Sequence, residues 1–320
     1  MDLSVVIPVH NAEKHLARTL DSVLAQGALP YSWEVLAVDD GSTDESPAIL
    51  REYAARAEKA GITFRTLAFP NGGVGVCRNR GLVHARGDAV LFLDSDDFLD
   101  PGALSYAMKK KAETGAAILL FDSRFAFPDG STRPFPSANH PGGAMSVRDY
   151  MLAQPCPWNK ICDRALFTET GLRFEEGILY EDLAVIPALG SAAEGRIFYA
   201  KKAVHSYYQS EGSIMRAPWS AKRLDLLRAL LALEKNAKDR KTEVEYLYFL
   251  HLYRNFVWQA WDAGERDAVR QANRLMKARF PHWQKNPLVR SLSARKERLT
   301  ALLFYHECFS LIRLWKGTKR

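Results

Sequence analysis

The sequence is poor in cysteine and has no cysteine pair of the kind that binds zinc. Four cysteines occur among 320 residues, and no two of them form a C-x-x-C pair: Cys77, Cys156, Cys162 and Cys308. A set this sparse is typical of reduced thiols in a cytoplasm. We therefore expect neither a structural zinc site nor a disulfide-stabilised secreted domain.

Long apolar runs are also missing. The longest candidate, Leu299–Tyr305, is far shorter than the roughly 18 apolar residues of a membrane span. The N-terminal run Leu3–Val9 follows an acid, contains a proline and has no basic segment before it, so it does not resemble an export signal. We expect a cytoplasmic protein, either soluble or bound peripherally to the inner face of the cell membrane.

The main part of the chain has no excess of charge. The formal net charge is +7, from 44 Lys and Arg against 37 Asp and Glu. Residues 279–320 hold ten of the basic and two of the acidic residues, which leaves residues 1–278 with 34 basic against 35 acidic. With a neutral body and no nucleic-acid-binding motif, we expect no nucleic acid partner. A nucleic-acid-binding or scaffold protein that uses the basic tail is the non-enzyme alternative.

Short apolar runs alternate with helical patterns over residues 1–125. Five runs are short, apolar and mostly β-branched, as buried strands are: Leu3–Val9, Glu34–Val38, Thr63–Phe69, Ala89–Leu93 and Ala117–Phe121. Helices are predicted after Asn11 as N-cap, after the capping-box pair Ser42 and Glu45, and over Val74–Arg86 and Pro101–Thr114. This alternation predicts an α/β fold with a mainly parallel sheet and helices on both faces.

The rest of the chain has a different pattern. Residues 125–146 predict a loop region with a hairpin across Pro128–Gly130, and further strands are expected at Ile197–Tyr199 and Val204–Tyr208. From Pro218 onward almost every segment has a helical pattern. We expect one α/β domain over 1–215, with halves 1–125 and 126–215, and an all-helical region over 216–320.

Acidic clusters follow two of the predicted strands. The carboxyl ends of parallel strands meet at one edge of an open sheet, where ligands bind. Asp94 and Asp96, two residues apart at a strand end, suit a hard cation such as Mg²⁺ or Mn²⁺. A capped turn before the next helix is the alternative, and the spacing alone does not separate the two.

Two common nucleotide-binding motifs are absent. The turn after the first strand, His10–Glu13, contains no glycine, which argues against a dinucleotide fold. Asn71–Gly75 contains three glycines but lacks both the full G-x-G-x-x-G motif and the Gly-Lys-Ser/Thr ending of a P-loop. We interpret it as a backbone-permissive loop before a helix.

Four blocks of the sequence, taken together, resemble the family 2 glycosyltransferases. In order they are Ser4–Asn11, Val38–Asp44, Gly75–Gly81 and Phe92–Asp97. The resemblance covers roughly residues 1–125 and implies the GT-A fold and an inverting enzyme that uses nucleotide-diphosphate sugars. One block would be weak evidence, but four in order are specific.

The resemblance also implies a role for each matching residue in donor binding. Pro8, Val9, His10 and Asn11 would line the nucleoside, Asp40 would hydrogen-bond the base, Arg78 would contact the nucleotide, and Asp94, Ser95 and Asp96 would form the DxD motif. His10 stands where the family often has Tyr, which alters a stacking contact. Asp96, with Asp94, would bind Mn²⁺ or Mg²⁺, and the metal would stabilise the diphosphate leaving group.

A second set of residues is implied for the acceptor side. Glu181-Asp182 resembles the family's ED motif, with Asp182 as general base and Glu181 as the alternate; an ordinary helix start is the other interpretation. Trp158, Asn159 and Lys160 resemble a family stretch near the acceptor. Gln209 stands near Gly212-Ser213-Ile214 where related chains often have Arg, which leaves a phosphate contact from that loop in doubt.

The helical region carries no family motif. Its aromatic run from Tyr246 to Trp261 is expected to be core rather than a sugar-binding surface, and the region could also form a homodimer. The segment 299–320 is apolar and ends in basic residues. An interfacial helix on anionic lipid and a core or subunit helix are both compatible with this pattern.

These observations predict a metal-dependent inverting glycosyltransferase. Its donor would be a nucleotide-diphosphate sugar, with UDP as the nucleotide. Its acceptor would be a hydroxyl of a glycan, free or lipid-linked, in the synthesis of a capsule, exopolysaccharide or lipopolysaccharide. Direct transfer to a polyprenyl phosphate is the alternative reaction.

Overall fold

The computed structural model describes residues 1–209, 218–292 and 295–312. The chain forms two compact units, Met1–Arg216 and Ala217–Arg320. Within the described residues, no helix combines the length and the apolar character that crossing a membrane requires.

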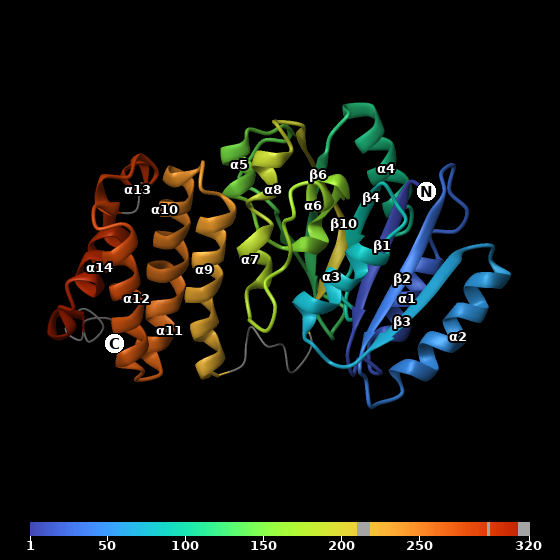
Figure 1. The fold of residues 1–320 in the computed structure, drawn as a ribbon, viewed down its shortest axis with the longest axis horizontal. Helices are drawn as coiled ribbons and strands as arrows, with labels where there is room; N and C mark the ends of the chain where they lie inside the picture. Colours follow the sequence, from blue (N-terminus) through green and yellow to red (C-terminus); the bar gives the residue numbers. More distant parts are fainter. Residues whose placement is uncertain (210–217, 293–294, 313–320) are drawn as a thin grey trace. The chain divides into compact units, whose positions relative to one another are not determined.

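A mixed sheet forms the centre of the first unit (Figure 1). Its order is β3-β2-β1-β4-β9-β6-β10-β5, with β7 paired to β6 and β8 to β10. The strands are β1 Leu3–Val9, β2 Trp33–Asp40, β3 Thr63–Phe69, β4 Ala89–Phe92, β5 Phe98–Leu99, β6 Ile118–Ala126, β7 Thr132–Phe135, β8 Gly143–Ala144, β9 Lys160–Asp163 and β10 Ile197–Tyr208.

The direction of the strands decides where their ends meet. Strands β1 to β4 are parallel to their neighbours in the order β3-β2-β1-β4, and β6 is parallel to β10. Strand β9 lies between β4 and β6 and is antiparallel to both. Strands β4 and β6 therefore run in the same direction, and the carboxyl ends of β1, β2, β4, β6 and β10 meet at one edge of the sheet.

Helices cover both faces of this sheet, as predicted. On one face α1 Leu16–Leu24, α2 Ser46–Lys59 and α4 Ala103–Thr114 enclose one apolar core, which includes Leu20, Leu50 and Leu104. On the other face α3 Val74–His84, α5 Val147–Met151, α6 Ala165–Thr168, α7 Glu181–Val185 and α8 Leu189–Ala192 enclose a second core. Apolar burial on both faces explains why the central strands are continuous hydrophobic runs.

Three local predictions in this unit were wrong. Strand β3 is not buried, because it lies at the sheet edge; its residues are all exposed or half-buried. Asn11 does not cap α1, which begins at Leu16; its side-chain oxygen accepts from the Thr43 N–H at 2.8 Å instead. Ser42 and Glu45 form no capping box, because Ser42 Oγ accepts from the Asn11 N–H. Contacts between distant segments took the place of the local caps.

Two other predictions concern the β-strands of the second half. The hairpin across Pro128–Gly130 is confirmed, since β6 and β7 pair antiparallel on either side of it. The two strands expected at Ile197–Tyr199 and Val204–Tyr208 are one strand, β10, whose register against β6 shifts between Tyr199 and His205.

The described part of the second unit is helical, as predicted. It contains α9 Asp225–Asn236, α10 Lys241–Phe249, a π-helical segment Leu250–Phe256, α11 Val257–Asp262, α12 Arg266–Arg279, α13 Pro287–Ser291 and α14 Arg295–Tyr305. The aromatic run supplies core, since Tyr248, Phe249, Tyr253, Phe256 and Trp261 are at most 5% exposed.

The apolar residues of α14 and the turn after it also pack inside this unit. Phe304 and Ile312 are buried, and the Phe304 ring contacts Trp258 and Trp261 edge to face. These contacts favour the core-helix interpretation for residues 295–312. The basic residues Arg313, Lys316, Lys319 and Arg320, on which the membrane interpretation depends, lie outside the described residues.

Candidate active site

Three carboxylates follow β4 at the common edge of the sheet. Asp94 and Asp96 are half-buried, whereas Asp97 is fully buried. Helix α1 fixes the backbone between them, because Thr19 Oγ1 donates to the carbonyl oxygens of Ser95 at 2.9 Å and Asp97 at 2.7 Å. The turn is thus held through its main chain, and the carboxylates of Asp94 and Asp96 are left for other partners.

The residues at this turn fit a divalent cation. Burial, followed by the negative charges of Asp97 and Asp94, raises the pKa of Asp96 to about 7. Carboxylate oxygens are the donor set of Mg²⁺ and Mn²⁺, which complete their coordination with water and phosphate. Among the described residues, no group of three or more acidic, histidine or cysteine side chains could hold a metal ion. A cation held by Asp94 and Asp96 would take its remaining ligands from water and phosphate.

Arg78, on α3, has a carboxylate on each side of its guanidinium group. It donates to Asp94 Oδ1 at 2.7 Å and to Glu181 Oε1, and its side chain is only 4% exposed. Both terminal nitrogens are therefore used inside the protein. The nucleotide contact that the resemblance implies for Arg78 stays a prediction, and the structure shows an internal counter-ion that joins the turn after β4 to α7.

Glu181 and Asp182 form the first turn of α7. A glycine lets α3 approach the segment before α7: a Cβ atom at Gly75 would lie 2.6 Å from the Glu175 carbonyl oxygen, and 3.4 Å from Glu181 Cβ. Burial, followed by the charge of Glu181, raises the pKa of Asp182 above its ordinary value, and the charge of Arg78 opposes this. A carboxylate with a raised pKa accepts a proton near neutral pH, as a general base must.

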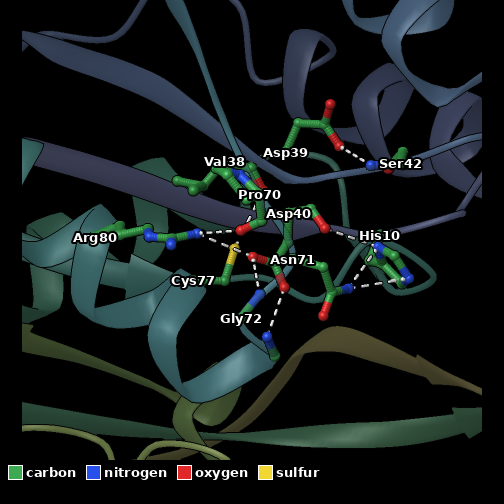
Figure 2. A network of polar contacts seen from close by, with 11 residues as sticks. His10, Val38, Asp39, Asp40, Ser42, Pro70, Asn71, Gly72, Cys77 and Arg80 are labelled. Atoms are coloured by element: carbon green, nitrogen blue, oxygen red, sulfur yellow. Dashed lines mark hydrogen bonds and ion pairs between the residues drawn. The ribbon is translucent and has the colours of Figure 1, made fainter.

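Asp40, at the end of β2, holds the glycine loop that precedes α3 (Figure 2). Its carboxylate accepts from the Gly72 N–H at 3.0 Å, the Gly73 N–H at 2.8 Å and Arg80 at 3.1 Å, and the residue is 3% exposed. A loop anchored in this way keeps a fixed position at the sheet edge. The base contact predicted for Asp40 stays a prediction, and any base would share the carboxylate with these three donors.

The predicted nucleoside loop is exposed at only two of its four residues. Pro8 and Val9 are buried within β1, whereas His10 and Asn11 are exposed. His10 Nδ1 lies 2.9 Å from the Asp40 carbonyl oxygen, and Asn71 Nδ2 lies 3.1 Å from Nδ1 and 3.2 Å from Nε2 (Figure 2). A carbonyl accepts and an amide nitrogen donates, so these partners favour the tautomer with hydrogen on Nδ1. The imidazole thus contacts both Asp40 and Asn71.

The stretch Trp158–Lys160 is buried, with no residue more than 5% exposed. Asn159 Nδ2 donates to Ser137 Oγ at 3.0 Å, and Lys160 Nζ donates to the Cys156 carbonyl oxygen. Burial lowers the pKa of Lys160 to about 8, and the charge of Asp182 is among those that oppose this shift. The segment thus lies near the candidate base and supports the wall of the site, while direct acceptor contact by these residues stays a prediction.

A buried pair next to the turn that carries Asp94 and Asp96 was not predicted. His205 Nε2 lies 3.2 Å from Asp97 Oδ2, although without hydrogen-bond geometry, and the Tyr208 N–H donates to Asp97 Oδ1 at 2.8 Å. Burial raises the pKa of Asp97 well above its ordinary value and lowers that of His205 to about 3. Strand β10 is therefore attached to the turn that carries Asp94 and Asp96. No local signal in the sequence brings residue 205 next to residue 97.

The last part of the predicted site is only partly described. Gln209 is buried at the end of β10, and its N–H donates to the Ala126 carbonyl oxygen at 2.8 Å. Gly212, Ser213 and Ile214 lie outside the described residues.

Comparisons with known proteins identify the family of this chain. The model of the family described as glycosyl transferase family 2 matches residues 4–177. A poly(ribitol-phosphate) beta-glucosyltransferase of Bacillus spizizenii is 39% identical over 104 residues, which is 32% of this chain and 16% of that protein. The chain thus spans much less than two thirds of the length of this curated relative.

Solved structures show the same fold. The chain superposes on residues 1–349 of TarS from Staphylococcus aureus, solved with UDP-GlcNAc, with a TM-score of 0.73 and 21% identity over 95% of this chain and 89% of that one. A mannosyltransferase from Pyrobaculum calidifontis, solved with GDP-Man and Mn²⁺, gives a TM-score of 0.55 and 16% identity, covering 95% and 86%.

Proposed function

The chain belongs to glycosyltransferase family 2, and from this premise we propose that it transfers a sugar from a UDP-sugar to a hydroxyl of a surface polysaccharide, with inversion at the anomeric carbon. The observation that carries the proposal is the joining of two acidic motifs by one residue, since Arg78 bonds both Asp94 and Glu181. A candidate metal site and a candidate base therefore meet at one sheet edge.

In this proposal each side chain has a limited task. Asp94 and Asp96 would hold Mg²⁺ or Mn²⁺, which supplies positive charge to the leaving diphosphate. His10, Asn11 and the loop anchored by Asp40 would bind the nucleoside. The partly exposed carboxylate of Asp182 would remove the proton of the acceptor hydroxyl as the hydroxyl attacks the anomeric carbon from the face opposite the diphosphate.

The choice of donor and polymer is supported by the relatives. TarS was solved with UDP-GlcNAc, and the curated relative is named for poly(ribitol-phosphate), a polyol-phosphate polymer that, like a polysaccharide, offers hydroxyl groups as acceptors. A metal is supported by the Mn²⁺ in the mannosyltransferase and by the oxygen donors of this chain.

The test uses purified full chain with UDP-GlcNAc, UDP-glucose and UDP-galactose, with Mn²⁺ or with EDTA. We expect release of UDP from one donor in Mn²⁺, loss of release in EDTA, and no release by Asp96→Ala. Thermal stabilisation by UDP and Mn²⁺ together would give a second readout, because ligand binding raises apparent stability. Release that is unchanged both in EDTA and in Asp96→Ala would contradict the metal assignment.

Membrane association is a separate part of the proposal, and it depends on the basic residues within 313–320. Because Phe304 and Ile312 are buried in the helical unit, the useful variant removes only residues 313–320. We expect the full chain to sediment with vesicles containing anionic lipid at low salt, and the shortened chain to stay in solution. Equal sedimentation of both would refute a role for these basic residues.

A further inference from the structure

Three half-buried aromatic rings gather where β6, β7 and β10 end. They belong to Phe125 on β6, Phe135 on β7 and Tyr207 on β10, and we call them the aromatic platform. The ring centroids of Phe125 and Phe135 are 4.8 Å apart, and Tyr207 lies 5.9 Å from Phe125 and 6.3 Å from Phe135. Paired strands fix these positions, since Phe125 stands opposite Tyr207 in the β6–β10 register.

A buried tryptophan supports the aromatic platform from inside. Trp158 is 5% exposed, stacks on Tyr207 at 5.2 Å and lies 5.5 Å from Phe135. Its other neighbour is His205, stacked at 4.6 Å. The inner ring thus provides the core contact, and the three outer rings keep part of their surface open. By contrast, aromatic core residues of the helical unit such as Tyr248 and Phe249 are fully buried.

The aromatic platform is attached to the candidate metal turn. Tyr208, the next residue after Tyr207, donates its N–H to Asp97, and Asp97 directly follows Asp96 in the chain. The charges of Asp182, Asp94 and Asp97 all act to raise the pKa of Cys156, after the larger effect of burial, and Cys156 lies two residues before Trp158. Both acidic motifs and the support of the platform therefore lie close together.

The order of strands gives the aromatic platform a definite side of the site. His10 and Asp40 end β1 and β2, Asp94 follows β4, and the platform ends β6 and β10. In the sheet these strands lie in the order β2-β1-β4-β9-β6-β10. A nucleotide sugar with its nucleoside over β1 and β2 and its diphosphate at Asp94 would point its sugar toward β6 and β10. The acceptor must then approach from the side of the platform.

We propose that Phe125, Phe135 and Tyr207 form the acceptor subsite, where the apolar C–H face of an acceptor sugar ring or polyol chain stacks on the rings. Aromatic side chains provide large apolar contact area, and tyrosine adds a polar group at its edge. Ligand pockets combine aromatic walls with a few polar groups in this way. The inference rests on the proposed function, because it assumes that the donor binds at Asp94 and Asp96.

The experiment separates transfer from donor hydrolysis, in which water replaces the acceptor. Full-chain wild type, Tyr207→Ala, Tyr207→Phe and Phe125→Ala are assayed with UDP-GlcNAc, UDP-glucose or UDP-galactose, and with methyl β-glucoside, methyl β-galactoside or ribitol 5-phosphate as acceptor. We expect Tyr207→Ala and Phe125→Ala to raise the acceptor KM at least tenfold and to leave UDP release in water within twofold of wild type. Tyr207→Phe keeps the ring and should remain near wild type.

A matched control removes an aromatic side chain elsewhere. Tyr106, half-buried on α4 with Lys202 over its ring at 4.1 Å, lies outside the aromatic platform, and Tyr106→Ala should leave the acceptor KM unchanged.

Saturation-transfer NMR with the same three acceptors gives a binding readout that needs no donor. Equal acceptor KM and equal NMR signal in wild type and Tyr207→Ala, or no signal from any of the acceptors with the wild type, would overturn the platform. A different outcome would refute the proposed donor chemistry alone: the wild type releases no UDP, but the NMR signals of the acceptors still decrease when a ring of the platform is removed.

Discussion

The structure predicts a large effect from removing the charge of Arg78. We choose Arg78→Met, which keeps most of the side-chain volume and removes the guanidinium group that bonds Asp94 and Glu181. The Glu181 side chain is 10% exposed, so its carboxylate would lose its counter-ion in a mostly buried place, whereas Asp94, 27% exposed, could regain water. The loss of stability in Arg78→Met should therefore come mainly from the unpaired carboxylate of Glu181.

Removing one partner of a buried ion pair costs about 3–5 kcal/mol. Because Asp94 can rehydrate, we expect the lower end, about 3 kcal/mol, in the free energy of unfolding. With a urea m-value of about 3 kcal/mol per molar, this shifts the unfolding midpoint of the first unit down by about 1 M. The double variant Arg78→Met/Glu181→Gln removes the unpaired buried charge as well and should recover about half of that shift.

The assay is urea unfolding followed by tryptophan fluorescence, together with the dissociation constant of UDP in Mn²⁺. An unchanged midpoint in Arg78→Met, combined with UDP affinity lowered tenfold or more, would refute the counter-ion role. That outcome would support the nucleotide contact that the family resemblance implies. A lowered midpoint with partial recovery in the double variant would support the reasoning from the structure.

The remaining predictions concern the base, the glycine loop and one packing contact. Asp182→Asn should lower kcat by about 10²–10⁴-fold at unchanged donor affinity in initial-rate assays. Since the folded pKa of Asp182 is raised, its proton stabilises the fold at low pH, and this stability is lost as pH rises through that pKa. The urea unfolding midpoint of Asp182→Asn, relative to that of the wild type, should therefore rise between pH 5 and pH 8. A difference in midpoint that stays constant over this pH range would contradict the prediction. Asp40→Ala removes the acceptor of Gly72 and Gly73 N–H groups and should cost about 1.5–3 kcal/mol by urea unfolding and weaken UDP binding in calorimetry. Gly81→Ala places a Cβ 2.3 Å from Val6 Cγ1 and should cost about 1–3 kcal/mol, whereas Val83→Ala, exposed on the same helix, should leave the midpoint unchanged.

Local patterns predicted the elements of the first unit well where apolar burial decides them. Strands β1 and β2 lie within a few residues of their predicted bounds, because a run buried on both faces needs continuous apolar side chains. Helices α3 and α4 also lie within a few residues of their predicted bounds. Local patterns failed where a polar side chain had a distant partner. Asn11 and Ser42 were predicted as caps, yet each bonds the segment of the other across parallel strands.

The candidate site likewise contains residues that the sequence indicated and contacts that only the structure showed. Asp94, Asp96, Glu181 and Asp182 could be selected from the sequence because the ordered motifs resemble those of the family, whereas spacing alone left a capped turn and an ordinary helix start as alternatives. The use of Arg78 as counter-ion, the Asp97–His205 pair and the aromatic platform depend on segments that are far apart in the chain. Strand β9 was not predicted, although its insertion between β4 and β6 sets the distance between the two halves of the site.

The sequence by itself determined the fold class and the family and indicated the residues of the candidate site, because these follow from apolar periodicity and from short motifs. The tertiary structure decided which of those residues meet and which have a free carboxylate. It did so because the parallel sheet brings strand ends to one edge, where burial changes the pKa of Asp96 and Asp182 and makes an arginine between two carboxylates an internal counter-ion. It also placed half-buried rings beside that edge, and no motif in the sequence indicated them.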